Sequence, residues 1–247
     1  MNSTINEKEI LNQVKNSFDV ICKIGNNDEH LKKILSNVKL EENDICLDLG
    51  TGNGYVAFEI ANKFHNSKII GIDIVEKVIA NNNKIVMEDK LDNIKFKLYN
   101  GVDIPLPDNS VNYIITRFAL HHFPRIDKTI SELNRILKKN GKIFIIDCVP
   151  NVEDNENFIN KWMKIIKDGH VKFYTQKEYV EMFKKYNIII EKEFYTDVIC
   201  KRTKNLEYEN LLKNTNKKVV NSYLEMINDN EIWLKEKVWN VIWKRGI

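Results

Sequence analysis

An acidic residue and three alternating glycines form the stretch of this sequence best suited to chemistry. Asp48 ends a short apolar run, and Gly50, Gly52 and Gly54 follow before a helical pattern begins. Glycine adopts positive φ angles and lets a ligand approach the backbone closely, and the following helix presents free backbone N–H groups. The alternative is a tight turn that is merely rich in glycine, but the acids Asp48 and Asp73 flank the unit. The pattern therefore predicts a nucleotide-type cofactor site.

The spacing of this loop separates the possible cofactors. The dinucleotide fingerprint is GxGxxG, and a P-loop carries a Lys-Ser/Thr pair after its glycines. Here the spacing is GxGxG, and Tyr55-Val56-Ala57 follows. The carboxylate of Asp48 would repel a pyrophosphate, whereas it suits a ligand that carries positive charge and no phosphate. S-adenosylmethionine, with its ammonium and sulfonium groups, meets these conditions.

A second acid follows at the distance that a ribose contact requires. Asp73 ends the next predicted strand, about 20 residues after the loop, where a carboxylate can accept hydrogen bonds from ribose hydroxyls. Ile74 would then lie against the adenine face. The alternative role of Asp73 is to cap the helix predicted after it.

Two adjacent histidines, His121 and His122, follow the fourth predicted strand. Ligands bind at the carboxyl ends of strands in open α/β sheets, so these imidazoles would face the same site. Methyl transfer from a sulfonium mainly requires alignment of the acceptor, and a base helps only when the acceptor must lose a proton. Either histidine is a candidate base, and a packing role is the alternative. Arg117 would bind an acidic substrate or form a surface ion pair.

Strands and helices alternate through the middle of the chain. Apolar runs predict strands at 45–49, 68–73, 94–99, 111–117 and 142–147, with helices at 55–64, 75–91 and 126–137. Nearly continuous apolar strands are typical of parallel strands covered on both faces. The order predicts a doubly wound α/β sheet. Later patterns predict helices at 158–167, 176–186 and 206–226, and strands at 187–202 and 232–243.

Four motifs in this order resemble the class I S-adenosylmethionine-dependent methyltransferases, and most closely their type-11, UbiE-like branch. They are "LDLGTGNG", "GIDI", "LPDNSVNYIITRFALHHF" and "ELNRILKKNGKIFIID", within about residues 40–150. The resemblance implies a Rossmann-like sheet of seven mostly parallel strands with an antiparallel last strand and helices on both faces. We expect one domain over 1–247: a helical cap (1–40), a cofactor-binding core (41–150), and a lid insert with C-terminal strands (151–247).

The resemblance also implies roles for individual residues. The methionine part of the cofactor would lie among Asp48, Gly50, Thr51, Gly52 and Gly54, the ribose on Asp73, and the adenine on Ile74. The family usually places an Asp and a backbone N–H beside the adenine, where this chain has Gly101-Val102. Asp103 or Asn100 would replace the missing acid, and Val102 would keep the N–H. The carbonyl of Arg117 would face the cofactor's amine.

The acceptor would lie beyond the cofactor, against the ends of the fourth and fifth strands. We expect Phe118, His122 and Asp147 to contact it, with Cys148 as a lining residue. The lid would come from the N-terminal helices and from the segment after Asp147. Its candidate aromatic residues are Phe18, Trp162, His170, Phe173 and Tyr174. No residue pattern predicts a metal site.

Composition limits the classes of function. A net charge of +3 with lysines spread along the chain does not favour a nucleic-acid partner. Arg117-Phe118-Ala119-Leu120 stands where base N-methyltransferases usually carry Asn/Asp-Pro-Pro-Tyr/Phe. No apolar run reaches the roughly 18–20 residues of a membrane span, and the N-terminus lacks the features of a signal peptide. We therefore expect a cytoplasmic monomer or homodimer.

The leading prediction is a methyltransferase that acts on a small molecule, with S-adenosylmethionine as methyl donor and S-adenosylhomocysteine as product. A second possibility is a protein that binds S-adenosylmethionine without catalysis and has a regulatory or partner role. A third is a nicotinamide-dependent oxidoreductase, because that class shares the fold. Asp48 and the GxGxG spacing disfavour the third.

Overall fold

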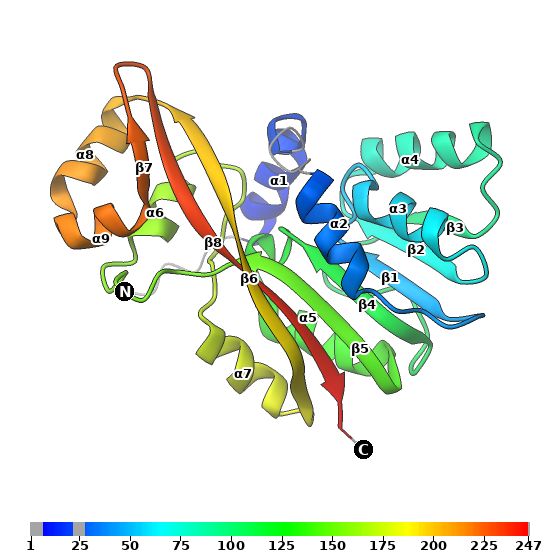
Figure 1. Cartoon of the computed structure of the whole chain (residues 1–247). Helices are drawn as coiled ribbons and strands as arrows, with labels where there is room; N and C mark the ends of the chain where they lie inside the picture. The colour runs from blue at the N-terminus through cyan, green and yellow to red at the C-terminus, as the bar shows by residue number, and fades with distance from the viewer. Residues whose placement is uncertain (1–6, 22–27, 247) are drawn as a thin grey trace.

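The computed structural model describes residues 7–21 and 28–246, and its centre is one twisted sheet (Figure 1). The strands follow the order β3-β2-β1-β4-β5-β8-β6, and β7 pairs with β8. Their bounds are β1 Ile45–Leu49, β2 Lys68–Asp73, β3 Ile94–Leu98, β4 Val111–Arg117, β5 Leu137–Cys148, β6 Ile188–Thr203, β7 Leu224–Ile227 and β8 Glu231–Arg245. The first five strands are parallel, and β8 runs antiparallel to β5, β6 and β7.

Helices cover both faces of the sheet because the central strands are apolar on both sides. On β5, Phe144 and Ile146 belong to one buried cluster, and Ile143 and Ile145 belong to another on the opposite face. The first cluster includes side chains of α2, α3, α6, α8 and α9, and the second includes those of α5 and α7. The helix bounds are α1 Glu7–Ile21, α2 Asp28–Asn37, α3 Tyr55–Lys63, α4 Glu76–Glu88, α5 Ile126–Ile136, α6 Phe158–Lys164, α7 Gln176–Lys184, α8 Leu206–Asn214 and α9 Lys217–Tyr223. A short 3₁₀ turn, η1, spans Leu120–His122.

The predicted doubly wound fold is confirmed, with differences at the C-terminal side. The predicted helix over 206–226 is broken into α8 and α9, because Thr215 is extended and Asn216 starts a new helix by accepting a bond from the Lys218 N–H (2.8 Å). The chain then enters β7, an eighth strand that the sequence did not predict. In the described part of the chain, the helices are too short or too polar to cross a membrane.

The strands β6 and β8 extend beyond the rest of the sheet. β5 ends with Cys148 opposite Val238, whereas β6 and β8 continue their pairing until Thr203 lies opposite Glu231. This extension, 197–203 with 231–237, projects toward the upper left of Figure 1, where β7, α6, α8 and α9 gather around it. It forms the far wall of the site described next.

Candidate cofactor and active site

A cavity of about 610 Å³ lies at the carboxyl ends of the parallel strands. Following the strand order, its wall passes from Asp73 at the end of β2, past Asp48 on β1 and Arg117 on β4, to Cys148 on β5. It continues to Arg202 on the β6–β8 extension. The helix α1 lines it with Leu11, Val14 and Ser17. This position matches the general location of ligand sites in open α/β sheets.

The glycine loop after β1 is held tightly beneath the cavity. The N–H groups of Gly50 and Thr51 both donate to the Ile72 carbonyl (3.0 Å each). Gly50 has φ of 71°, and an added Cβ would lie 2.6 Å from the Cβ of Ala119. Only glycine therefore lets the loop pass this segment. Gly50, Thr51 and Gly52 all line the cavity.

Gly54 has a different role from the other two glycines. It does not line the cavity in the described structure, which differs from the predicted cofactor contact. Its φ is 77° at the start of α3, and an added Cβ would lie 2.6 Å from the ring of Phe58. Gly54 therefore serves the turn and the helix packing.

Asp48 is a buried carboxyl group facing the glycine loop. It is 2% exposed, and the hydroxyl of Thr51 donates to its Oδ2 (2.7 Å). Burial raises the pKa of Asp48 to about 7, and the nearby charge of Asp73 adds to this, while the Thr51 bond and Arg117 oppose it. Because burial makes the ionised form of Asp48 unfavourable, a cation that binds beside the carboxylate would stabilise it.

Asp73 lines the cavity, and its carboxylate also accepts hydrogen bonds from backbone N–H groups, while the N-cap residue of α4 is Val75 rather than Asp73. Its Oδ2 accepts the Gly52 N–H (3.0 Å), and its Oδ1 accepts the Val75 N–H (3.1 Å). Burial raises the pKa of Asp73 despite these bonds. Each oxygen keeps a second lone pair for a hydroxyl donor. Ile74 lines the cavity beside it, as does Tyr99.

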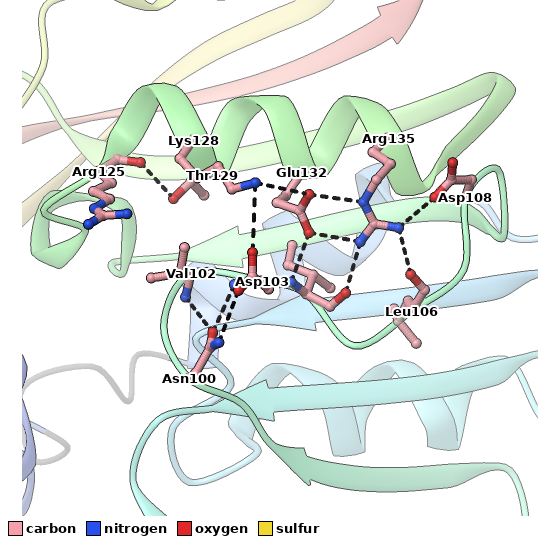
Figure 2. Close-up of polar contacts among 11 residues, drawn as sticks. Asn100, Val102, Asp103, Leu106, Asp108, Arg125, Lys128, Thr129, Glu132 and Arg135 are labelled. Carbon is pink, nitrogen blue, oxygen red and sulfur yellow. Dashed lines mark hydrogen bonds and ion pairs between the residues drawn. The ribbon is translucent and has the colours of Figure 1, made fainter.

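The segment after β3 departs from the predicted adenine contacts (Figure 2). The N–H groups of Val102 and Asp103 both donate to the Asn100 Oδ1 (2.8 Å each). The carboxylate of Asp103 accepts a bond from Asn100 Nδ2 (3.1 Å) and pairs with Lys128 (3.7 Å). Val102 and Asp103 do not line the cavity, whereas Gly101, with φ of 83°, does. The side chain of Asn100 uses the groups that were expected to face the adenine.

A polar clamp fastens the next part of this loop to α5 (Figure 2). Glu132 Oε2 accepts the Ile104 N–H (2.9 Å). Arg135 donates to the carbonyls of Ile104 (2.9 Å) and Leu106 (2.8 Å) and pairs with Glu132 (2.7 Å) and Asp108 (2.7 Å). The motifs "LPDNS" and "ELNRIL" are thus joined by direct contacts. Glu132 and Arg135 hold the loop after β3 in place without lining the cavity themselves.

His121 lines the cavity and forms a buried pair with Asp147, which does not line it. His121 Nδ1 lies 2.7 Å from Asp147 Oδ1, and the His121 N–H donates to Oδ2 (3.2 Å). Burial opposes protonation of His121, but the charge and bond of Asp147 outweigh it and raise the pKa. The contact places the Nδ1 proton toward the carboxylate, which leaves Nε2 as the basic nitrogen. No described residue forms a hydrogen bond with Nε2.

Asp147 does not face the acceptor space as predicted. Its Oδ1 also accepts the Cys148 N–H (2.9 Å), and the residue lies behind His121 rather than in the wall. These backbone donors turn the carboxylate inward. The structure therefore gives Asp147 the position of an orienting group for His121.

The other residues near the end of β4 form an aromatic and cationic wall. Arg117 lies over the rings of Tyr55 (5.4 Å) and Phe118 (4.6 Å), and Phe118 has a φ of 50°, uncommon outside glycine. His122 lines the cavity, and burial together with the neighbouring His121 holds its pKa well below the usual value. His122 is therefore a weaker base than His121.

Among the predicted lid aromatics whose side chains are described, Phe173 alone lines the cavity. Trp162, His170 and Tyr174 are buried without lining it, and the rings of His170 and Trp162 pack against the lining residues Phe173 and Tyr208. The side chain of Phe18 lies outside the described residues. The sequence analysis missed Val198, Cys200, Arg202, Tyr208 and Glu236, which form the far wall. The sequence did carry a signal for them. Residues 198, 200 and 202 are alternate positions of β6, so they share one face of the strand, and β6 has 16 residues, more than the central strands of the sheet.

Among the described residues, no group of His, Cys, Asp and Glu side chains has the arrangement of a metal site. The cavity offers instead a glycine cradle between two carboxyl groups, continuous with a histidine and an apolar space. These features fit the nucleoside, the ammonium group and the reactive centre of S-adenosylmethionine.

Comparison with known proteins agrees with this geometry. A family model described as a methyltransferase domain matches residues 40–187. The uncharacterized methyltransferase YcgJ of Bacillus subtilis is 26% identical over 63% of this chain and 61% of its own length. The demethylmenaquinone methyltransferase of Listeria welshimeri is 27% identical over 55% of this chain and 58% of its own length. A Bacillus halodurans C-125 protein described as a methyltransferase has a TM-score of 0.78 at 17% identity, covering 89% of this chain and 100% of that chain.

These likenesses differ in what they show. The chain spans less than two thirds of the length of the two curated relatives, and the structural likeness at 17% identity shows the shared fold. The family model matches more than half of the chain, including the glycine loop and the His121–Asp147 pair. This chain belongs to the class I S-adenosylmethionine-dependent methyltransferase family.

Proposed function

We propose that this protein transfers a methyl group from S-adenosylmethionine to a small-molecule acceptor. The observation that carries the proposal is one continuous cavity in which the glycine cradle, Asp48 and Asp73 lead to the His121–Asp147 pair. When bound, the cofactor supplies an electrophilic methyl group and a neutral leaving group. The task of the protein is then to orient the acceptor and exclude water.

Asp48 and Asp73 divide the recognition of the cofactor. Asp48 would balance its positive charge, since burial destabilises the lone carboxylate and raises its pKa. Asp73 would accept the ribose hydroxyls with its remaining lone pairs. Gly50 and Gly52 let the ligand approach the backbone, while Ile74 and Gly101 offer an apolar surface to the base.

His121 is the proposed general base for an acceptor that loses a proton. Its Nε2 would take the proton, and Asp147 would hold the ring and stabilise the resulting imidazolium. The buried Asp147 bond of 2.7 Å supports this order of roles. His122, with its strongly lowered pKa, would contact the acceptor as a neutral ring.

The acceptor space is mainly apolar, so a small organic molecule fits it better than a nucleic acid. The Listeria welshimeri relative is named for demethylmenaquinone, and we propose for this chain only the broader class. We also propose that it works in the cytoplasm as a monomer or homodimer.

Calorimetric titration with S-adenosylhomocysteine tests the cofactor site. We expect micromolar binding to the native protein and a loss of at least tenfold, about 1.4 kcal/mol, in Asp73→Ala. Asp103→Ala is the matched control, because this nearby carboxylate does not line the cavity, and its affinity should be native.

Turnover tests the reaction itself. The protein and S-adenosylmethionine would be incubated with a small-molecule collection, and mass spectrometry would detect acceptors that gain a methyl group. Absence of S-adenosylhomocysteine binding by a folded protein would overturn the proposal. Binding without methyl transfer to any acceptor would favour the non-catalytic alternative.

A further inference from the structure

A buried guanidinium lies at the end of the cavity that the β6–β8 extension forms, away from the glycine loop. Arg202 is 8% exposed and lines the wall from the β6–β8 extension. Its Nη1 donates to the Lys201 carbonyl (3.0 Å), and its Nη2 lies 3.7 Å from the sulfur of Met163. Its Nε has no hydrogen-bond partner among the described residues. Such donors usually find acceptors when buried, so this arrangement needs an explanation.

Asp168 and Glu236 lie near Arg202 without forming an ion pair with it in the described structure. Both acids feel its charge. The carboxylate of Asp168 accepts the His170 N–H (3.0 Å). Glu236 is 2% exposed, and burial raises its pKa despite contacts with the thiols of Cys200 and Cys148. A shift in that direction favours the neutral form of Glu236, which would leave the cation only partly balanced.

A second unused donor lies beside the guanidinium. The hydroxyl of Tyr208 on α8 lies close enough to Arg202 to interact with its guanidinium, but no described residue accepts the hydroxyl proton at hydrogen-bond geometry. Burial raises the pKa of Tyr208, and the neighbouring Arg202 opposes the rise. The hydroxyl therefore remains protonated at neutral pH and can donate. Arg202 and Tyr208 come from different elements and both line the same end of the cavity.

Apolar side chains form a large part of the remaining wall of this end: Met163, Ile166, Phe173 and Val198, with the thiol of Cys200. Lys201, Thr203 and Asn205 add polar groups to it, and Lys201 lies over the ring of Trp233 (3.8 Å). An apolar enclosure strengthens the attraction between a buried cation and an anion. It also rewards a ligand with a hydrocarbon or aromatic body. The two requirements together describe an organic acid: an oxyanion joined to an apolar frame.

We propose that the far end of the cavity binds the anionic group of an apolar organic acid through Arg202 and Tyr208, and that the methyl acceptor belongs to this class. The second half of this statement rests on the proposed function. The first half concerns binding alone. Asp168 feels the charges of both His121 and Arg202, so an acid anchored here would extend toward the proposed base.

Two fluorescent probes of the same ring system separate charge from apolar contact. 8-Anilino-1-naphthalenesulfonate carries a sulfonate, and N-phenyl-1-naphthylamine lacks it. We expect the native protein to bind the sulfonate at least tenfold more tightly than the neutral probe. Benzoate should displace the sulfonate probe, and benzamide should not.

Variants assign this preference to the two donors. Arg202→Met should abolish the discrimination between the probes and leave the neutral probe bound, while Arg202→Lys should retain part of it. Tyr208→Phe should reduce it several-fold. Lys204→Gln is the matched control, because it removes a nearby positive charge outside the cavity wall, and it should behave as the native protein.

The outcomes distinguish this proposal from a structural role and from failure of the proposed function. Equal affinity of both probes for the native protein, or discrimination that survives in Arg202→Met and Tyr208→Phe, would overturn it. If Arg202 merely balanced Asp168 and Glu236, Arg202→Met would lower the thermal midpoint, and Tyr208→Phe would not affect the probes. S-adenosylhomocysteine should bind Arg202→Met with native affinity. Loss of cofactor binding by the native protein would refute methyl transfer and leave the anion site standing.

Discussion

At the residue scale, the main feature of the site is the buried carboxyl group of Asp48, whose ionised form is unfavourable unless a cation binds beside it. The pKa of Asp48 is raised to about 7, so near-neutral pH changes its charge. An ionised Asp48 attracts the ammonium group of the ligand, whereas a protonated one does not. Binding of the cofactor should therefore be linked to release of a proton from Asp48.

This linkage predicts a pH-dependent affinity. The dissociation constant of S-adenosylhomocysteine should rise about tenfold for each pH unit below 7 and level off above it, as expected for one titrating group. Calorimetry between pH 5.5 and 8.5 measures this. In Asp48→Asn the affinity should be weak and nearly independent of pH, and Asp103→Asn should keep the native profile. A native slope in Asp48→Asn would assign the dependence to another group.

A second residue-scale prediction concerns the His121–Asp147 pair. A base must be neutral, and the pKa of His121 is raised, so turnover should fall as pH drops through a value above 6.5. His121→Gln should lower kcat by about 10²-fold or more and leave S-adenosylhomocysteine affinity unchanged. Asp147→Asn should lower kcat and shift the acidic limb of the pH–rate profile to lower pH, because Asp147 raises the pKa of His121. His65→Gln, on an exposed residue, is the control. An unchanged kcat in His121→Gln would show that the acceptor needs no base.

At the element scale, the central strands could be predicted because their apolar runs are local signals. β1, β2 and β4 have the predicted bounds. β7 could not be predicted, because Leu224–Ile227 becomes a strand only by pairing with β8. The far wall also depends on strand pairing and could not be predicted. Val198, Cys200 and Arg202 reach the cavity because β6 and β8 extend beyond the end of β5. The side chains of Asn100 and Asp147 accept hydrogen bonds from nearby backbone N–H groups. The sequence pattern does not show these bonds, so the predicted contacts of both residues differ from the observed ones.

The clamp between α5 and the loop after β3 leads to a stability prediction at this scale. Arg135→Leu should lower the free energy of unfolding by about 1–3 kcal/mol, because it leaves two loop carbonyls without their donor and removes the arginine partner of Glu132. The half-buried position of Arg135 moderates this value through solvent screening. Urea denaturation measures the change, with Arg125→Ala, an exposed ion pair, as a control that should be neutral. A neutral Arg135→Leu would show that the loop is held by its apolar contacts.

At the scale of the whole molecule, the cofactor-binding core and the C-terminal part share both apolar clusters. Val56 of α3 and Tyr223 of α9 belong to one cluster, and Leu47 of β1 and Trp243 of β8 belong to the other. The strand β8 lies between β5 and β6, so the last strand in the chain is internal to the sheet. Removing either part would expose the interior of both clusters. We therefore propose that the described residues, 7–21 and 28–246, unfold as one cooperative unit.

Thermal unfolding tests this unity, because the chain carries its tryptophans in one part and its cofactor cradle in the other. The four tryptophans are Trp162, Trp233, Trp239 and Trp243, whereas the glycine loop and Asp73 lie far earlier. Tryptophan fluorescence and far-ultraviolet circular dichroism should report one coincident transition. S-adenosylhomocysteine at a hundred times its dissociation constant should raise the midpoint of both signals together, for a gain of about 2.7 kcal/mol. Asp73→Ala, which weakens ligand binding at least tenfold, should reduce this gain to about 1.4 kcal/mol or less at the same ligand concentration. A tryptophan transition that stays in place while circular dichroism reports a second, ligand-shifted step would divide the chain into two units.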